Sequence, residues 1–251
     1  MDLTQKEALR KNCVSLLNAY KTGLLGDITM PEDTNPGFSP KETEERLAYF
    51  TMPMALNYQR DSFALWKAAL ATWNDPETRD VFDVCKASTM SVDDLRAKLT
   101  KHKLALQPNK HVNTWKVLSD TFNTHWGGIT GLFFEADNDY LKLRDLVQVK
   151  HKKGFPYLSG PKIFNYWSFI MSTYGNIPLL SRDHIEIAPD THVLKCSIKL
   201  GVFSELEASQ LTRERISEIW REALDGTNIA PIDLHSPLWF WSRGGFDYIL
   251  E

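Results

Sequence analysis

The stretch FPYLSGPKIFNYW, from Phe155 to Trp167, places a Gly-Pro-Lys sequence directly before an apolar and aromatic run. Ser159 or Gly160 can cap a helix, and Pro161 has its backbone angle preset for the first helical position. The pattern predicts a hairpin between two helices, with a buried helix that runs from Lys162 to Tyr174.

This hairpin is a candidate phosphate-binding element, because the first N–H groups of a helix lack partners within it and the helix dipole is positive there. Lys150, His151, Lys152 and Lys153 lie just upstream and add positive charge. The simpler interpretation is a solvated helix end followed by an ordinary helix start. Lys162 is then either a first-turn surface residue or a nucleophile.

The rest of the chain also indicates helices, because apolar residues recur at helical spacing along most of it. There is no strand alternation of comparable length, no repeat of fixed period and no low-complexity tract. We expect an all-α fold in which residues 27–38 form a loop. A helix start is expected at Ser39 and Pro40, with Glu42 completing a capping box, and Ser91 with Asp94 repeats that signal. Helices are expected over residues 3–25, 62–73, 92–101, 110–125, 139–149, 162–174, 191–200 and 213–224.

The composition is that of an ordinary globular protein of one domain or two closely packed lobes, with 251 residues of which 43% are hydrophobic. Its net charge of −3 gives no global sign of a nucleic-acid binder, so a polyanionic partner must be held locally. The three cysteines are widely spaced and suggest neither a disulfide framework nor a metal site. No membrane span or signal peptide is visible, and we expect an intracellular protein.

A second motif lies in IAPDTHVLKCSIKLG, residues 187–201. Asp190 stands where a helix N-cap belongs, and Gly201 is expected to end the helix. An aspartate at such a position is ordinarily only a cap. The apolar stripe between them consists of Val193, Cys196 and Leu200.

Taken together, the two motifs resemble the signature of the helix-hairpin-helix DNA glycosylase superfamily, the group of endonuclease III and 8-oxoguanine DNA glycosylase. That signature is a hairpin ending in Gly-x-Lys, then an aspartate that opens a helix as Asp-Thr-His-Val, and then Leu-Gly. The matching residues are Gly160, Pro161, Lys162, Asp190, Thr191, His192, Val193, Leu200 and Gly201.

The chain departs from the family pattern in three ways. Leu158 stands where the hairpin usually has a glycine, and the interval from Lys162 to Asp190 is longer than in most members, which implies an insertion around residues 176–186. The cysteine ligands of the endonuclease III iron–sulfur cluster are absent, so the resemblance is to the cluster-free branches.

The resemblance implies a fold of two helical lobes, with the hairpin at their junction and the active site in the cleft. A helical-barrel lobe would comprise residues 46–183, and residues 1–45 with 184–251 would form the other lobe. Lys162 and Asp190 would face each other across the cleft.

Two further segments are similar to family loops that enter the duplex. ALNYQRDS, residues 55–62, is similar to the loop whose glutamine fills the space of a flipped nucleotide, which nominates Gln59 with Asn57 nearby. KLALQPNKHVNTW, residues 103–115, is similar to the wedging loop and nominates Leu106 and Gln107. The hairpin itself nominates Ser159, Gly160, Lys152 and Lys153 as phosphate contacts.

The chemistry of base excision gives these residue types a reason. The enzyme must extrude the nucleotide from the duplex before it can reach the glycosidic bond. Asp190 could stabilise the positive charge that develops on the sugar. The amine of Lys162, if burial lowers its pKa, could attack the anomeric carbon, form a Schiff base and allow elimination of the 3′ phosphate.

The resemblance therefore implies a bifunctional DNA glycosylase and abasic-site lyase. Its partner would be double-stranded DNA with a damaged base or abasic site, it would act as a monomer without metal or organic cofactor, and it would be cytoplasmic or nucleoid-associated, or nuclear in a eukaryote. We expect 8-oxoguanine as the first substrate and oxidised pyrimidines as the second.

The C-terminal stretch APIDLHSPLWFWSRGGF, residues 230–246, supplies candidates for the base pocket, because aromatic faces stack on an extruded base. Trp239, Trp241 and Phe246 are nominated, although tryptophans at such spacing are usually core residues. His192 is interpreted as a structural histidine rather than a general base.

Two other functions stay open from the sequence. One is a monofunctional glycosylase for alkylated or other damaged bases, in which Lys162 only binds phosphate. The other is a non-catalytic protein that recognises DNA structure, because helix-hairpin-helix elements also serve simply to grip phosphates.

Overall fold

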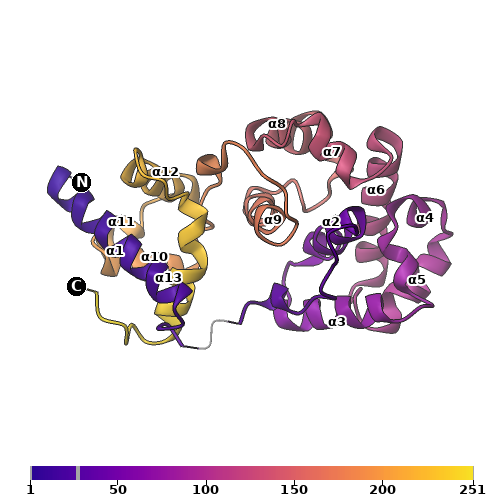
Figure 1. The fold of residues 1–251 in the computed structure, drawn as a ribbon, viewed down its shortest axis with the longest axis horizontal. Coiled ribbons are helices and arrows are strands. Elements are labelled where there is room, and N and C mark those ends of the chain that lie inside the picture. Colours follow the sequence, from indigo (N-terminus) through magenta and orange to yellow (C-terminus); the bar gives the residue numbers. More distant parts are fainter. Residues whose placement is uncertain (1, 27–28, 251) are drawn as a thin grey trace. The chain divides into compact units, whose positions relative to one another are not determined.

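The computed structural model describes residues 2–26 and 29–250 of the chain. Its fold is all-α, as predicted, with thirteen α-helices and seven shorter helical turns in these ranges (Figure 1). No β-strand occurs in the described part, where Asp139 and Leu180 form a single isolated bridge. None of the described helices is both long and apolar enough to cross a membrane.

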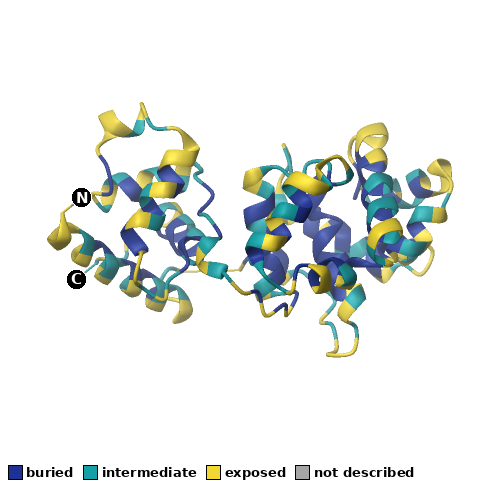
Figure 2. Cartoon of the chain, turned by 90° about the horizontal axis from the view of Figure 1, so that it is seen from above, coloured by how far each residue is buried: buried dark blue, intermediate teal, exposed yellow. Residues whose placement is uncertain are grey.

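The chain divides into two compact units, each with its own buried interior (Figure 2). The first unit combines the two ends of the chain, Met1–Thr29 and Ser181–Glu251, and the second is the continuous segment Met30–Leu180. Residues 30–45, which the sequence analysis assigns to the lobe of the N-terminal helix, thus group with the second unit.

The first unit is a small bundle in which the N-terminal helix packs among helices from the end of the chain. Its core contains Cys13, Cys196 and Trp220, all fully buried. Trp220 donates from Nε1 to Ser197 Oγ at 3.0 Å, which satisfies its polar atom in the core. The helices are α1 (Leu3–Lys21), α10 (Thr191–Lys199), α11 (Glu205–Ala208), α12 (Arg213–Leu224) and α13 (His235–Arg243), with the turns η6 (Arg182–His184) and η7 (Pro231–Leu234).

The second unit is larger and is built around aromatic side chains. Tyr49 and Phe50 of α2 pack against Trp66 of α3, and Trp167 of α9 donates from Nε1 to Thr51 Oγ1 at 3.0 Å. The helices are α2 (Thr43–Thr51), α3 (Ser62–Asn74), α4 (Val84–Thr89), α5 (Val92–Lys101), α6 (Pro108–Trp126), α7 (Ile129–Glu135), α8 (Tyr140–Arg144) and α9 (Pro161–Thr173). The turns are η1 (Pro31–Asp33), η2 (Met54–Leu56), η3 (Arg79–Phe82), the π-helical η4 (Asp145–Lys150) and η5 (Lys152–Gly154).

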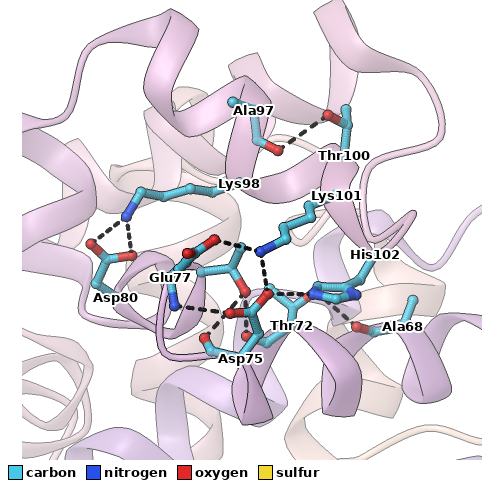
Figure 3. Close-up of polar contacts among 11 residues, drawn as sticks. Ala68, Thr72, Asp75, Glu77, Asp80, Ala97, Lys98, Thr100, Lys101 and His102 are labelled. Carbon is cyan, nitrogen blue, oxygen red and sulfur yellow. Dashed lines mark hydrogen bonds and ion pairs between the residues drawn. The ribbon is translucent and has the colours of Figure 1, made fainter.

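A polar cluster joins the end of α3 to the end of α5 (Figure 3). The Asp75 carboxylate pairs with Lys101 Nζ and His102 Nε2, each at 2.7 Å, and accepts the Glu77 N–H at 2.9 Å. The hydrogen bonds from Lys101 and His102 hold the pKa of Asp75 well below its usual range. A second ion pair, Lys98 with Asp80 at 2.6 Å, lies beside it. The cluster therefore fixes α5 relative to the chain that leaves α3.

The local capping signals predict the starts of α5, α9 and α10 correctly, and one further start needs a correction. Ser91 caps α5 as expected, because its hydroxyl accepts the Asp94 N–H at 3.1 Å. The helix expected from Ser39 and Pro40 begins only at Thr43. One bond of the predicted capping box is present, because the Glu42 side chain accepts the Ser39 N–H at 2.9 Å.

Candidate nucleic-acid interface

The loop after η2 presents a glutamine in a strained backbone conformation. Gln59 has φ 52° and is exposed, although a residue with a side chain loses about 1 kcal/mol in this left-handed region. The preceding Asn57 is half-buried, and its side-chain oxygen accepts the Ser62 hydroxyl at 3.0 Å. Asn57 therefore shapes the loop, while Gln59 projects from it.

The segment before α6 forms a second exposed tip beside the first. Leu106 is 52% exposed, and Gln107 stands at the N-cap position of α6. The Leu106 N–H donates to His111 Nδ1 at 3.1 Å, which holds the tip against the first turns of the helix. An exposed leucine supported in this way is suited to enter between stacked bases.

Arg60 joins these two segments. Its guanidinium donates from Nη1 to the Leu104 carbonyl at 2.8 Å and from Nη2 to the Lys103 carbonyl at 3.4 Å. Burial lowers the pKa of Arg60, and Arg60 in turn contributes to a lowered pKa of His111, for which burial is the main cause. Both side chains therefore act as internal braces between the loop of Gln59 and the tip of Leu106.

The turn before α9 has Gly160 at the N-cap of the helix and Pro161 in its first turn, as predicted. Leu158 is fully buried and anchors this turn. The N–H groups of Ser159 and Gly160 donate within the turn, to Phe155 and Tyr157 respectively.

Because those two N–H groups are already bonded, the donors left at the start of α9 belong to the next residues along the helix. No hydrogen bond from the N–H of Lys162 or Ile163 is found among the described residues. Lys162 itself is exposed in the first turn of the helix, so the burial that the nucleophile hypothesis assumes is not observed.

A pair of stacked tyrosines brings the hairpin against the loop of Gln59. The rings of Tyr58 and Tyr157 lie 4.0 Å apart between centroids, at 14° to each other. Lys110, from the first turn of α6, places its Nζ 5.3 Å from the centre of one ring and 5.2 Å from the other. Burial raises the pKa of Tyr58, whereas hydrogen bonding to Lys110 lowers the pKa of Tyr157. Three segments that are distant in sequence therefore meet at this stack.

The basic run beside the hairpin contains two kinds of residue. Lys150 pairs with Asp145 at 2.9 Å, and the His151 ring packs 4.4 Å from that of His125. Lys152 and Lys153 are exposed, and no ion pair within the described ranges involves them. These two lysines are therefore the members of the run that are available to a phosphate.

Asp190 caps α10 in the first unit, as the sequence predicts, and accepts the Val193 N–H at 2.9 Å. His192 Nδ1 lies 3.1 Å from Ser242 Oγ, and its ring packs 5.4 Å from Trp239, which suits a structural histidine. Because Asp190 and Lys162 belong to different units, their approach across a cleft stays a prediction.

The three nominated aromatic residues differ in accessibility. Trp241 is buried in the core of the first unit and donates from Nε1 to the Tyr248 carbonyl at 2.8 Å. Trp239 is half-buried, with the Arg243 guanidinium 4.8 Å from its ring centre. Phe246 packs edge-on against Trp241 at 4.8 Å and is contacted by Lys199. Trp239 and Phe246 therefore keep surface that a ligand can reach, whereas Trp241 supports the fold.

Five residues that build this region were not nominated from the sequence: Tyr58, Arg60, Lys110, His111 and Tyr157. All lie within or beside the segments that were singled out, and two of them are neighbours of nominated residues. Tyr58 and Tyr157, the tyrosines of two segments already singled out, were the signal from which this contact could have been predicted. We define the candidate interface as the exposed Gln59, Leu106, Gln107, Lys110, Lys152, Lys153 and Lys162 of the second unit.

Comparison of the chain with models of known protein families, with curated proteins and with solved structures gives no significant match.

Proposed function

We propose that the protein is a DNA base-excision repair glycosylase that flips out a damaged base, cleaves its glycosidic bond and nicks the abasic site by β-elimination. The observation that carries the proposal is the meeting of three loops in the second unit. The Tyr58–Tyr157 stack brings together the loop of the exposed Gln59 and the segment before α9, and Lys110 ties in the tip of the exposed Leu106. The resemblance of the two sequence motifs supports the same function.

In this proposal each group has a defined role. The N–H groups at the start of α9 and the lysines of the basic run bind phosphate, which positions the duplex without reading its sequence. Leu106 separates the stacked bases, and Gln59 fills the space that the extruded nucleotide leaves. The cost of unstacking, a few kcal/mol, is offset by these contacts.

The proposed reaction starts when Lys162 Nζ gives up a proton to solvent and attacks the anomeric carbon. A C–N bond to Lys162 forms, the glycosidic bond breaks, and the base leaves with its electron pair and takes up a proton. Asp190 stabilises the cationic sugar in the transition state. The nitrogen then loses a proton, the C1′–O4′ bond of the sugar breaks and O4′ takes up a proton, which leaves a Schiff base between C1′ and Lys162. Loss of a proton from C2′ breaks the C3′–O bond and expels the 3′ phosphate, and hydrolysis of the C1′–N bond releases the lysine. The substrate proposed first is 8-oxoguanine.

Trapping of the Schiff base tests this proposal. Incubation with a duplex containing one lesion or an abasic site, together with borohydride, should give a stable covalent adduct on Lys162. Lys162→Ala should lose both the adduct and strand cleavage. Lys153→Ala is the matched control, because it removes a nearby exposed lysine and should still form the adduct.

Asp190→Asn separates catalysis from folding. Asparagine is as good an N-cap as aspartate, so α10 should keep its start, while base release should slow by about 100-fold or more. A Lys162→Ala protein that still traps and cleaves would assign the chemistry to another amine.

A monofunctional glycosylase is the second candidate, because Lys162 is exposed at a helix start where a phosphate would bind. This function predicts base release without trapping on any lesion. Duplex binding with neither base release nor trapping would favour a non-catalytic DNA-binding protein.

A further inference from the structure

The stack of Tyr58 and Tyr157 lies where two strained backbone segments meet. Tyr58 directly precedes Gln59, which has φ 52°, and Tyr157 itself has φ 62° within the hairpin. Such conformations persist only where the surrounding structure holds them. With centroids 4.0 Å apart and nearly parallel rings, the stack is the contact that ties one strained segment to the other.

Two further contacts hold the pair in place. The Tyr58 ring also packs edge-on against His111 at 5.4 Å, and Lys110 Nζ lies beside the stack, 5.3 and 5.2 Å from the two ring centres. Lys110 also forms a hydrogen bond with the Tyr157 side chain. Because His111 and Lys110 both belong to the first turns of α6, the tip that carries Leu106 is held to the same stack.

We infer that the Tyr58–Tyr157 stack is a positioning element. It holds Gln59 in the conformation that inserts into the duplex, and it couples this insertion to phosphate binding by the hairpin. This inference rests on the proposed function. Neither ring is assigned a contact with the reacting atoms. The stack acts through Gln59, because Tyr58 is its neighbour in the chain.

The experiment compares Tyr157→Ala with Tyr157→Phe. The substrate is a duplex in which 2-aminopurine lies beside an abasic analogue, so that its fluorescence reports the entry of a side chain into the stack. Tyr157→Ala should slow the fluorescence change by about tenfold, whereas Tyr157→Phe, which keeps the ring stacking, should stay close to the wild type. Urea unfolding of each variant checks that the fold is retained.

A double-mutant cycle shows whether Tyr157 acts through Gln59. If it does, the fluorescence change with the double variant Gln59→Ala, Tyr157→Ala should be no slower than the change with Gln59→Ala alone. Additive slowing of the fluorescence change in the double variant would overturn the inference. Two other results would also overturn it: a Tyr157→Phe variant as slow as Tyr157→Ala, or a Tyr157→Ala variant as fast as the wild type. Should Tyr157→Ala unfold, the same cycle is run with Tyr157→Leu.

The inference and the proposed function fail in different ways. The abasic analogue undergoes no chemistry, so its fluorescence signal reports insertion even from a protein that cleaves nothing. A wild type that inserts but releases no base from any lesion would contradict the proposed glycosylase and leave the positioning role intact. A wild type that releases bases, together with unchanged insertion in Tyr157→Ala, would contradict the positioning role alone.

Discussion

Gln59 and Tyr157 adopt backbone conformations that most residues with side chains avoid. Each strained residue lies next to, or within, the aromatic stack, and Gln59 is an exposed member of the candidate interface. Strain of this kind is retained where it positions a group in advance, which lowers the entropy lost when that group acts. At the residue scale, the candidate interface is therefore organised by backbone geometry as much as by side-chain chemistry.

Replacement of Gln59 tests its proposed role as a plug. Gln59→Ala should slow base release from a fully paired duplex by about tenfold, but have little effect on a lesion that is already unpaired, because only the first requires extrusion. Gln59→Gly is the matched control, since it also removes the side chain while relieving the backbone strain. Single-turnover kinetics measure the rate of base release by both variants on the paired and the unpaired lesion. Equal slowing on paired and unpaired lesions would show that Gln59 has another role.

At the element scale, a buried carboxyl joins η1 to the aromatic core of the second unit. Glu32 is fully buried and accepts Trp66 Nε1 of α3 at 3.0 Å. Burial raises the pKa of Glu32 to about 7, against hydrogen bonds that lower it. Since the raised value favours the protonated acid in the folded state, the stability that depends on this proton is complete below the ordinary glutamate pKa of about 4.3 and is lost as the pH rises through 7.

Glu32→Gln should therefore flatten the pH dependence of stability. The glutamine can still accept the Trp66 N–H, but it does not ionise. Between pH values of about 5 and 8 the wild type should lose up to roughly 3 kcal/mol of unfolding free energy relative to the variant. Urea unfolding at several pH values measures the difference, in which the contributions of other groups cancel. Parallel curves for the two proteins would show that Glu32 keeps one protonation state throughout.

At the scale of the whole molecule, the net charge of −3 conceals a local excess of positive charge. Most lysines elsewhere in the second unit are paired: Lys86 with Asp83 at 3.1 Å and Lys142 with Asp137 at 2.6 Å are examples. Lys152 and Lys153, in contrast, have no such partner among the described residues. An acidic protein can therefore bind a polyanion through a small set of unpaired cations.

Salt dependence of duplex binding tests this arrangement. Lys152→Ala with Lys153→Ala should weaken binding similarly for all DNA sequences, and should reduce the slope of log affinity against log salt by about 0.9 for each lost contact. The control, Lys86→Ala with Lys142→Ala, removes the same charge from paired lysines and should leave the slope nearly unchanged. Fluorescence anisotropy over a salt series measures both. An identical slope in the two double variants would place Lys152 and Lys153 outside the interface.

The sequence by itself determined most of the longer helices and several of their ends. The boundaries of α5 and α12 are those predicted, because capping residues and apolar periodicity act within a few residues of the chain. Helices α4, α7, α11 and α13 were not predicted, since short segments carry too few turns to show a period. The hairpin start at Gly160 and the cap at Asp190 were likewise predicted from local patterns.

Only the tertiary structure decided which of these residues meet. Tyr58 and Tyr157 come from two separate loops and Lys110 from the first turn of α6, and no local pattern indicates that their side chains pack together. The same holds for Glu32, whose position reads as an exposed loop until Trp66 and the core around it are in place. Local patterns report the interactions of residues that are neighbours in the chain. Contacts between distant segments depend on how the helices pack, and that packing is set by the summed burial of many side chains rather than by any one motif.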